Sequence, residues 1–303
     1  MDKDTAIRSF VDKRPESLGV YGYGSGVFKQ VGYSLKSHPQ IDVILLVDDL
    51  REWHQQNLKM NSSDYSIMGR IHVNINDLDK LKGYNKINYY SHIKDGNLYF
   101  KYGVMEEKDF ISFLSTWRSI FVAGRFHKPT LEIKGNDKEH RAIEENRRQA
   151  MFVAALLSPP IVYKKEFLKT VCNLSYIGSI RMNIAENPHK VENIVNGCMD
   201  DLASLYDMNL PFISFIDNDR IFISHRIAMA HVKELPLYLV IYLYKNVYDF
   251  SSLEDIRTGI VAFFTERNKV EEYRQFMDGI STNGIVRSVP YVLSKVKKRI
   301  IKQ

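Results

Sequence analysis

A glycine-rich turn lies near the start of the chain and contains one serine. The segment GVYGYGSGVFKQVGY covers residues 19–33 and places Ser25 between Gly24 and Gly26. Glycines let backbone amides approach a ligand closely, and unpaired amides at the start of a helix favour an anion such as phosphate. The segment matches neither GxxxxGK[ST] nor GxGxxG. It predicts a phosphate-binding turn, and an ordinary hairpin or turn is the alternative.

A carboxylate heads the next apolar segment. The run QIDVILLV at residues 40–47 is short and rich in β-branched side chains, which favours a buried strand with Asp42 near its start. A triphosphate held at the turn would need Mg²⁺, and the Asp42 carboxylate is the predicted ligand. Asp48 is the second candidate ligand, but about 20 Å of extended strand separates it from Asp42 unless the strand bends. The alternative for Asp42 is a solvated acid at a strand end.

The chain also contains patterns for the elements that would position these residues. A strand at 40–47, a helix that follows an Asp49 cap, and a hairpin that turns at 94–96 predict an α/β first domain over residues 1–140. A helix is expected over 106–124, and an extended segment follows it. The order of glycine turn, helix and acid-bearing strand resembles nucleotidyltransferases of the polymerase-β type.

The second part of the chain has a different pattern. Helices are expected at 142–157, 163–182 and 188–206, and a hairpin is expected around 217–219. Helices followed by a hairpin predict a winged-helix-like domain over residues 141–234. A helical region with a basic tail is expected over residues 235–303.

The net charge of +6 is concentrated in the last twenty residues. In GIVRSVPYVLSKVKKRIIKQ, apolar residues fall on one helical stripe and bases on the other side, which predicts an amphipathic helix at the surface of an anionic membrane. A solvated terminus or a helix docked on the core is the alternative. The predicted membrane-contacting residues are Arg287, Lys295, Lys297, Lys298, Arg299 and Lys302.

Other bulk properties narrow the class of protein. Two cysteines are too few for a disulfide framework, no apolar run approaches the roughly 18 residues of a spanning helix, and the N-terminus lacks a secretory signal. These properties favour a protein of a reducing compartment that no membrane-spanning helix anchors.

Six motifs follow one another in the order seen in the Tam41/Mmp37 family, which the chain resembles from about residue 18 to 206. The resemblance implies a nucleotidyltransferase domain, a winged-helix-like domain and Mg²⁺-dependent transfer of CMP from CTP to phosphatidic acid, which gives CDP-diacylglycerol and pyrophosphate. Relatives carry Asp after the glycine of the fifth motif, where this chain has Ser179. The motifs are YGSGVFKQ (23–30), IDVILLVDD..EWH..NL..N...YS (41–66), KYGV (101–104), AGRFHKP (123–129), LSYIGSIRM (174–182) and NPHKVENIV (187–195).

The motifs also supply cations for such a reaction. An acceptor phosphomonoester is largely ionised at neutral pH, so catalysis is expected to consist of positioning and charge neutralisation rather than strong base chemistry. Asp42, Lys101 and Lys128 are the predicted catalytic residues. The predicted nucleotide-binding residues are Gly24, Ser25, Gly26, Arg125, Tyr176 and Arg181.

Two other functions are compatible with parts of these patterns. A nucleotidyltransferase acting on RNA or another soluble acceptor would keep the turn and Asp42 and use the tail for nucleic acid. A non-catalytic basic winged-helix protein would bind nucleic acid alone. The chain before the last twenty residues has no net charge, so nucleic acid is not an expected partner. The expected partners are CTP, phosphatidic acid and an anionic membrane surface. The resemblance implies a peripheral membrane enzyme. Its expected location is the cytoplasmic face of a bacterial membrane, or the matrix face of the mitochondrial inner membrane for a trimmed eukaryotic chain.

Overall fold

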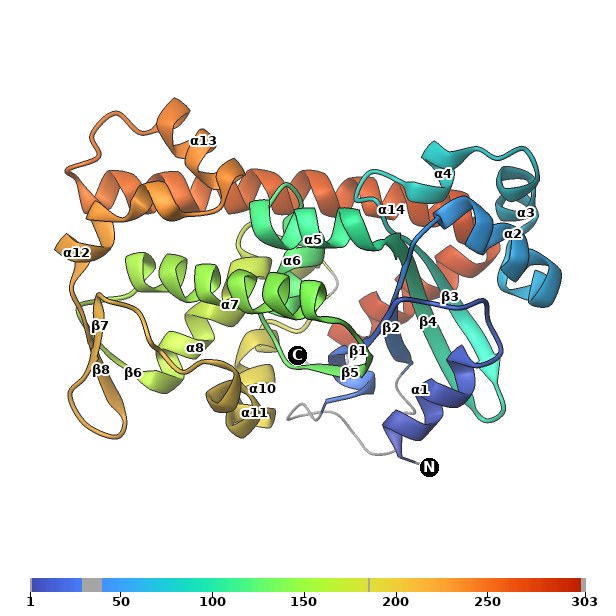
Figure 1. The fold of residues 1–303 in the computed structure, drawn as a ribbon, viewed down its shortest axis with the longest axis horizontal. Coiled ribbons are helices and arrows are strands. Elements are labelled where there is room, and N and C mark those ends of the chain that lie inside the picture. The colour runs from blue at the N-terminus through green and yellow to red at the C-terminus, as the bar shows by residue number, and fades with distance from the viewer. Residues whose placement is uncertain (1, 29–39, 185, 301–303) are drawn as a thin grey trace.

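The fold has two parts joined by one long helix (Figure 1). The computed structural model describes residues 2–28, 40–184 and 186–300, and it leaves out the side chains of residues 78, 81, 183, 184 and 280–300. The N-terminal part is built on a five-stranded sheet, and the second part is mostly helical. The chain therefore has the mixed α/β character that its sequence predicts.

The larger sheet has the strand order β3-β4-β2-β1-β5. Strands β2 and β4 are parallel and the other neighbours are antiparallel. The central strand β2 has apolar residues on both faces, because Val43 and Leu45 enter one core and Ile44 and Leu46 enter another. The strands are β1 (Gly19–Tyr23), β2 (Ile41–Val47), β3 (Asn88–Asp95), β4 (Leu98–Glu106) and β5 (Thr130–Lys134).

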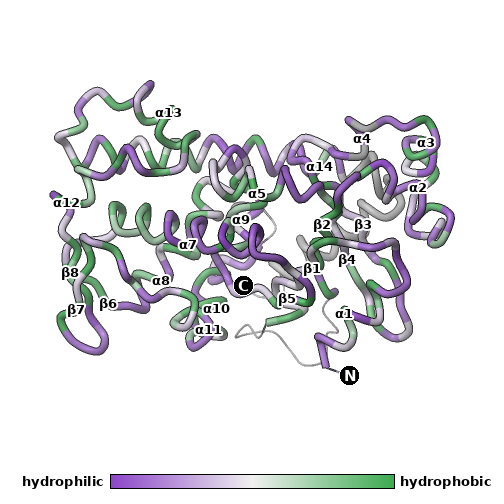
Figure 2. Tube along the Cα trace, viewed as in Figure 1, coloured by the Kyte–Doolittle hydropathy of each residue, from purple (hydrophilic) through white to green (hydrophobic). Residues whose placement is uncertain are grey.

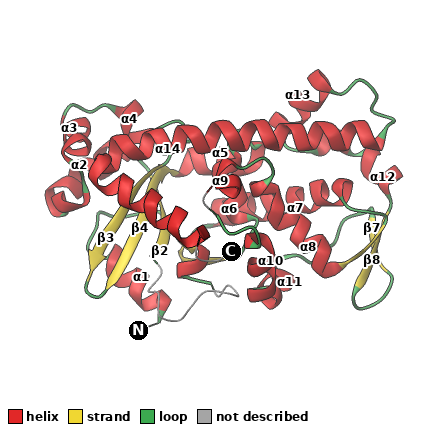
Figure 3. Cartoon of the chain, turned by 180° about the vertical axis from the view of Figure 1, so that it is seen from behind, coloured by secondary structure: helices red, strands yellow, loops and turns green. Residues whose placement is uncertain are grey.

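Helices cover both faces of this sheet, as Figure 3 shows from behind. Phe10 and Trp53 pack on one face, and Phe110 and Phe126 pack on the other. The Asp49 side chain accepts a hydrogen bond from the Glu52 amide at 2.8 Å, which confirms the predicted helix cap. The helices of this part are α1 (Lys3–Val11), α2 (Leu50–Met60), α3 (Ile67–Asn74), α4 (Leu78–Lys82), α5 (Glu107–Thr116) and α6 (Ile120–Phe126).

The prediction of a single helix over 106–124 is wrong. The chain instead forms α5 and α6, which are separated at Trp117 by a left-handed backbone conformation with φ of 56°. The Trp117 side chain is fully buried and donates from Nε1 to the Asn146 amide oxygen at 2.8 Å. This distant contact stabilises a turn that the local helical pattern does not reveal. Because α6 is a separate helix that begins after this break, it can place Arg125 in the space between the two parts.

The second part has its own three-stranded sheet, in the order β6-β8-β7. Figure 2 shows α7 changing from hydrophilic to hydrophobic along its length, and its last turns enter the core of this part. The boundary expected near residue 140 falls in the first turns of α7. The elements are α7 (Asp137–Leu157), β6 (Ile161–Tyr163), α8 (Lys164–Asn173), η3 (Leu174–Tyr176), α9 (Ile180–Ile184), α10 (Lys190–Gly197), α11 (Met199–Leu205), β7 (Ile213–Phe215), β8 (Arg220–Ile223), α12 (His225–Ala230) and α13 (Leu237–Asn246).

The long helix α14 (Leu253–Ile300) runs along both parts (Figure 1). It packs against α13, α9 and α6 and then reaches β3 and α3 of the larger sheet. Ile256, Ile260 and Phe264 are completely buried, so this stretch of the helix belongs to the core. Across the described ranges, no helix is both long and apolar enough to cross a bilayer.

Candidate active site

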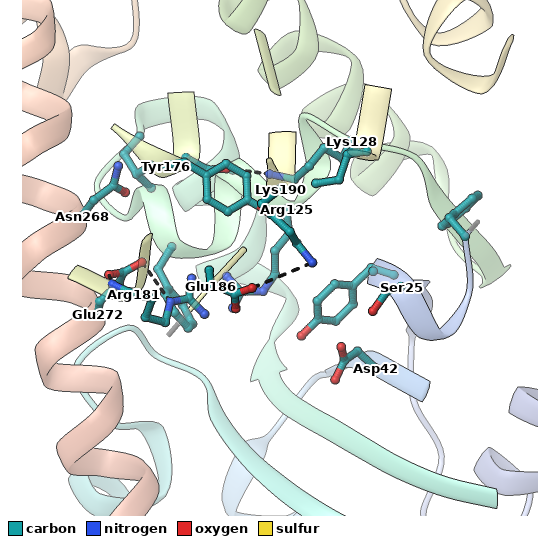
Figure 4. Close-up of a pocket in the computed structure, with 18 of the residues that line it drawn as sticks. Ser25, Asp42, Arg125, Lys128, Tyr176, Arg181, Glu186, Lys190, Asn268 and Glu272 are labelled. Carbon is teal, nitrogen blue, oxygen red and sulfur yellow. Dashed lines mark hydrogen bonds and ion pairs between the residues drawn. The ribbon is translucent and has the colours of Figure 1, made fainter. Parts of the chain in front are cut away.

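A cavity of about 170 Å³ lies between the end of the larger sheet and the helical part. Figure 4 shows Ser25 and Asp42 on one side of it and Arg181, Glu272 and Asn268 on the opposite side, beside α14. Residues from all six motifs therefore share one cavity with the long helix. The predicted site residues that line it are Gly24, Ser25, Asp42, Lys101, Arg125, Lys128, Tyr176 and Arg181.

The glycine turn forms one edge of this cavity. A short 3₁₀ turn, η1 (Gly24–Gly26), follows β1 and lies against the start of β2. Gly24 has a φ of +75°, a conformation that L side chains rarely adopt, and a Cβ on Gly26 would lie 2.2 Å from the Gln40 carbonyl oxygen. The turn therefore requires glycine at both positions. The helix expected after it, within residues 29–39, lies outside the described residues.

Asp42 and Lys101 are brought together by the register of two neighbouring strands. They are direct partners in the parallel pair β2–β4, and Lys101 Nζ lies 3.9 Å from Asp42 Oδ1. Lys101 Nζ also lies 4.2 Å from the centre of the Tyr89 ring. Asp42 Oδ2 approaches Gly24 closely, since a Cβ there would lie only 3.3 Å from it. One carboxylate, one ammonium group and the bare turn thus meet at the end of the sheet.

The donor set at Asp42 fits an ion that is shared with a nucleotide. Among the described side chains, no group of three or more His, Cys, Asp or Glu residues could hold a metal ion alone. Mg²⁺ commonly keeps several waters and uses one or two carboxylates together with substrate phosphates. Asp42 can supply such a single carboxylate, and the adjoining turn leaves room for phosphate oxygens.

Asp48 does not belong to this site, and its prediction as a metal ligand is corrected. Strand β2 runs unbroken from Ile41 to Val47, so Asp48 follows its far end and is exposed there. An extended strand rises about 3.3 Å per residue, which separates the two carboxylates by roughly 20 Å. The bend that would have brought Asp48 to Asp42 is not present.

Arg125 enters the cavity from α6. Its guanidinium carbon lies 3.8 Å from the centre of the Phe121 ring, and Arg125 Nε is buried without a hydrogen-bond partner among the described residues. The start of α6 is held by Glu271 of α14, whose carboxylate accepts hydrogen bonds from the amides of Ile120 and Phe121 at 3.2 and 2.6 Å. A buried acid from a distant helix therefore acts as the cap that positions Arg125.

Lys128 lies deeper on the same wall. Its Nζ donates a hydrogen bond to Ser175 Oγ at 2.6 Å and lies 4.9 Å from the centre of the Tyr176 ring. Burial, together with the nearby cations Arg125 and Arg181, lowers the pKa of Lys128 to about 7. A bound anion would favour the protonated form of this lysine.

The affinity of this cavity for an anion such as a nucleoside triphosphate is expected to depend on pH through Lys128. As the pH rises from 6.5 to 8.5, the free protein loses this charge and must take up a proton to bind, so the dissociation constant should increase on the order of tenfold. Lys128→Arg keeps the cation and should flatten the dependence. Isothermal titration calorimetry at both pH values tests this. If Lys128→Arg shows the same pH dependence as the wild-type protein, a group other than Lys128 causes it.

Sequence reasoning missed several residues of the cavity. Lys190 and Glu186 line it and form an ion pair at 4.0 Å, and Lys190 lies within the last motif. Asn268 donates from Nδ2 to the carbonyl oxygens of Leu174 and Ile177, which holds the turn that carries Tyr176. Nothing local marks residues 268–272 as part of a site, because their role depends on where α14 crosses the cavity. The three residues that α14 adds to the cavity are Asn268, Glu271 and Glu272.

Ser179, for which the family resemblance predicts Asp, is buried beside Glu272. Its Oγ donates a hydrogen bond to Glu272 Oε1 at 2.6 Å. A carboxylate at position 179 would lie beside the Glu272 carboxylate, and the two negative charges would repel each other. The serine instead donates a hydrogen bond to Glu272.

The membrane prediction concerns parts of the chain that the structure leaves out. The backbone of α14 is helical to Ile300, in line with a C-terminal helix. The side chains of Arg287, Lys295, Lys297, Lys298 and Arg299, and all of Lys302, lie outside the described residues. Contact between these bases and a membrane therefore stays a prediction.

Comparison with known proteins assigns the chain to a family. The Tam41/Mmp37 model, described as "Phosphatidate cytidylyltransferase, mitochondrial", matches residues 7–298. A protein of that name from Schizosaccharomyces pombe is 33% identical over 92% of this chain and 79% of its own length. One from Caenorhabditis briggsae is 26% identical over 92% of each. A crystal structure of a nucleotidyltransferase-like protein from Exiguobacterium sibiricum covers 91% of this chain and 77% of that chain at 13% identity, with a TM-score of 0.26 that is too low to define a shared fold. The chain belongs to the Tam41/Mmp37 family.

Proposed function

We propose that this protein is a phosphatidate cytidylyltransferase, which joins CTP and phosphatidic acid to form CDP-diacylglycerol and pyrophosphate. The observation that carries the proposal is the convergence of the glycine turn, Asp42 and cations of later motifs on one cavity, in a member of the Tam41/Mmp37 family. The names of the relatives state the same activity for those proteins.

The proposed reaction is a displacement at the α-phosphorus of CTP. An oxygen of the phosphatidate phosphate forms a bond to this phosphorus, the bond to the β-phosphate oxygen breaks, and pyrophosphate leaves with that electron pair. The second pKa of a phosphomonoester is about 6, so the attacking oxygen needs no strong base at neutral pH. The main barrier is repulsion between two anions, which charge neutralisation and positioning lower.

The cavity offers the groups for this task. Amides of the turn would hold the phosphate chain at the Asp42 end, and Lys101 would neutralise charge beside them. Arg125 can grip phosphate oxygens, and its buried Nε, which has no hydrogen-bond partner among the described residues, fits an anionic ligand. Lys128 lies on the same wall as Arg125, and Arg181 approaches from the helical part. Asp42 would hold Mg²⁺, which would polarise the transferring phosphate and neutralise its charge when bound.

The second part of the chain is proposed to be winged-helix-like. Its order α7, β6, α8, further helices and then the β7–β8 hairpin supports this, as does the central place of β8 between β6 and β7. In the proposed enzyme it forms one wall of the nucleotide cavity through Tyr176, Arg181 and Lys190.

The protein is proposed to work at a membrane, because phosphatidic acid is a lipid. The basic residues of the C-terminal tail would bind anionic lipid, and the helix α14 would connect that contact to the cavity. The relatives are eukaryotic proteins named as mitochondrial. We therefore propose the matrix face of the mitochondrial inner membrane, rather than a bacterial membrane.

The activity is tested by incubating the full chain with CTP, Mg²⁺ and liposomes that contain phosphatidic acid. CDP-diacylglycerol and an equal amount of pyrophosphate are the expected products, and EDTA should abolish both. RNA oligonucleotides and soluble phosphomonoesters in separate reactions test the alternative acceptors. Nucleotide transfer to these acceptors without transfer to the lipid would contradict the proposal.

A further inference from the structure

Glu272 lines the cavity, and two of its hydrogen bonds come from Arg181. It lies on α14 and its side chain is only 6% exposed. Its carboxylate accepts hydrogen bonds from Ser179 Oγ at 2.6 Å, from the Arg181 amide at 3.2 Å and from Arg181 Nε at 3.0 Å. Figure 4 shows this pair beside α14, at the wall opposite Asp42. Two of the three donors belong to Arg181, so one carboxylate orients both its backbone and its side chain.

Two effects oppose the position of Arg181 in the cavity. Its side chain is 46% exposed and comes from α9, a helix of only five residues, so holding it in one conformation costs rotamer entropy. Arg125 and Lys128 line the same cavity, and Arg181 contributes to lowering the pKa of Lys128 through charge repulsion. The bonds from Arg181 to the Glu272 carboxylate offset both effects.

The acid is itself held in place by the fold. Glu272 is one helical position away from Glu271, which caps α6, and one turn after Asn268, which holds the carbonyls at 174 and 177. The Ser179 hydroxyl donates to Oε1 of the Glu272 carboxylate, which favours the observed orientation of this side chain. A charge-assisted bond between a buried carboxylate and a guanidinium is about twice as strong as a neutral one. The wall that faces the turn is therefore organised by α14.

We propose that Glu272 is a positioning residue that holds the Arg181 guanidinium toward the phosphate chain of the bound nucleotide. It acts through Arg181 and makes no contact with the nucleotide. This inference rests on the proposed function only in naming CTP as the anion that Arg181 faces. It does not depend on which acceptor receives the nucleotide.

The test is a double-mutant cycle of Glu272→Gln and Arg181→Ala, read out as the dissociation constants of Mg²⁺–CTP and of inorganic tripolyphosphate. The glutamine oxygen can still accept from the Arg181 amide, and its NH2 group can donate to Ser179 Oγ, so the fold should persist. We expect Glu272→Gln to weaken binding about tenfold in the wild-type background and less than twofold in the Arg181→Ala background. In the lipid assay, Glu272→Gln should raise the KM for CTP and leave kcat within about twofold.

Glu266→Gln is the matched control, because Glu266 is an exposed acid on the same helix that bonds Tyr242 rather than a cavity residue. It should leave both dissociation constants unchanged. The Arg181 Nε–H signal in ¹H–¹⁵N NMR should shift in Glu272→Gln and not in Glu266→Gln. Equal loss of affinity in both Arg181 backgrounds would overturn the inference, as would wild-type protein that binds neither probe. If the double-mutant cycle shows coupling but the protein forms no CDP-diacylglycerol, the inference about Glu272 is upheld and the proposed function is refuted.

Discussion

Asp42→Asn is expected to lower kcat for CDP-diacylglycerol formation on the order of 10³-fold, which corresponds to about 4 kcal/mol of transition-state stabilisation. Asp42 is the acid that the larger sheet places beside the glycine turn, 3.9 Å from Lys101. Asparagine has nearly the same shape but binds Mg²⁺ far less well and leaves the lysine charge unbalanced. Steady-state kinetics with CTP and phosphatidate liposomes measure the loss.

Asp48→Asn is the matched control, since it makes the same change just beyond the other end of the same strand. It should retain nearly full activity, because Asp48 is exposed and far from the cavity. In Asp42→Asn, Mn²⁺ or higher Mg²⁺ should restore part of the rate if the carboxylate acts through an ion. Equal kinetic effects of the two substitutions would contradict the assignment of Asp42 and the correction made for Asp48.

Gly26→Ala is expected to have the second-largest effect, through the shape of the turn. An added Cβ would lie 2.2 Å from the Gln40 carbonyl oxygen and 2.9 Å from the Ile41 Cα atom, and both are backbone atoms that cannot rotate away. The turn must therefore move off the start of β2 and away from Asp42. We expect a loss of about 1–3 kcal/mol in the free energy of unfolding, typical of an overpacked site, and a loss of CTP affinity of about two orders of magnitude.

Denaturant unfolding and calorimetric CTP titration measure the two effects of Gly26→Ala separately. Gly279→Ala serves as the control, because a Cβ at Gly279 would meet no atom of the described residues within 4 Å. It lies inside α14, where alanine favours the helix, so neither stability nor CTP affinity should fall. CTP binding by Gly26→Ala with wild-type affinity would show that the nucleotide does not depend on the conformation of this turn.

Elements with strong local signals were predicted correctly. The strand at 40–47, the helix capped by Asp49 and the hairpin turning at 94–96 all occur in the structure. Their determinants lie within a few residues of each other, as with the side chain of Asp49 and the amide of Glu52. The hairpin around 217–219 is confirmed for the same reason.

Elements that depend on distant contacts were not predicted. The break between α5 and α6 requires the burial of Trp117 against Asn146, which lies 29 residues further along the chain. The acid that caps α6 lies about 150 residues after it. Hydrophobic periodicity in a short segment shows which face of a helix is apolar, but it does not show which distant residues pack against that face. It therefore predicts neither contact.

The amino-acid sequence alone determined the kinds of chemistry that this chain can perform. Motif order identified the family, and the types of residue in those motifs named the turn, Asp42 and most of the cations, because phosphate chemistry depends on bare amides, carboxylates and fixed positive charge. Only the tertiary structure decided which of these groups meet. It brought Lys101 beside Asp42 through strand register, separated Asp48 by the length of β2, and added Glu272 from α14, because proximity in a folded chain follows from packing between distant segments.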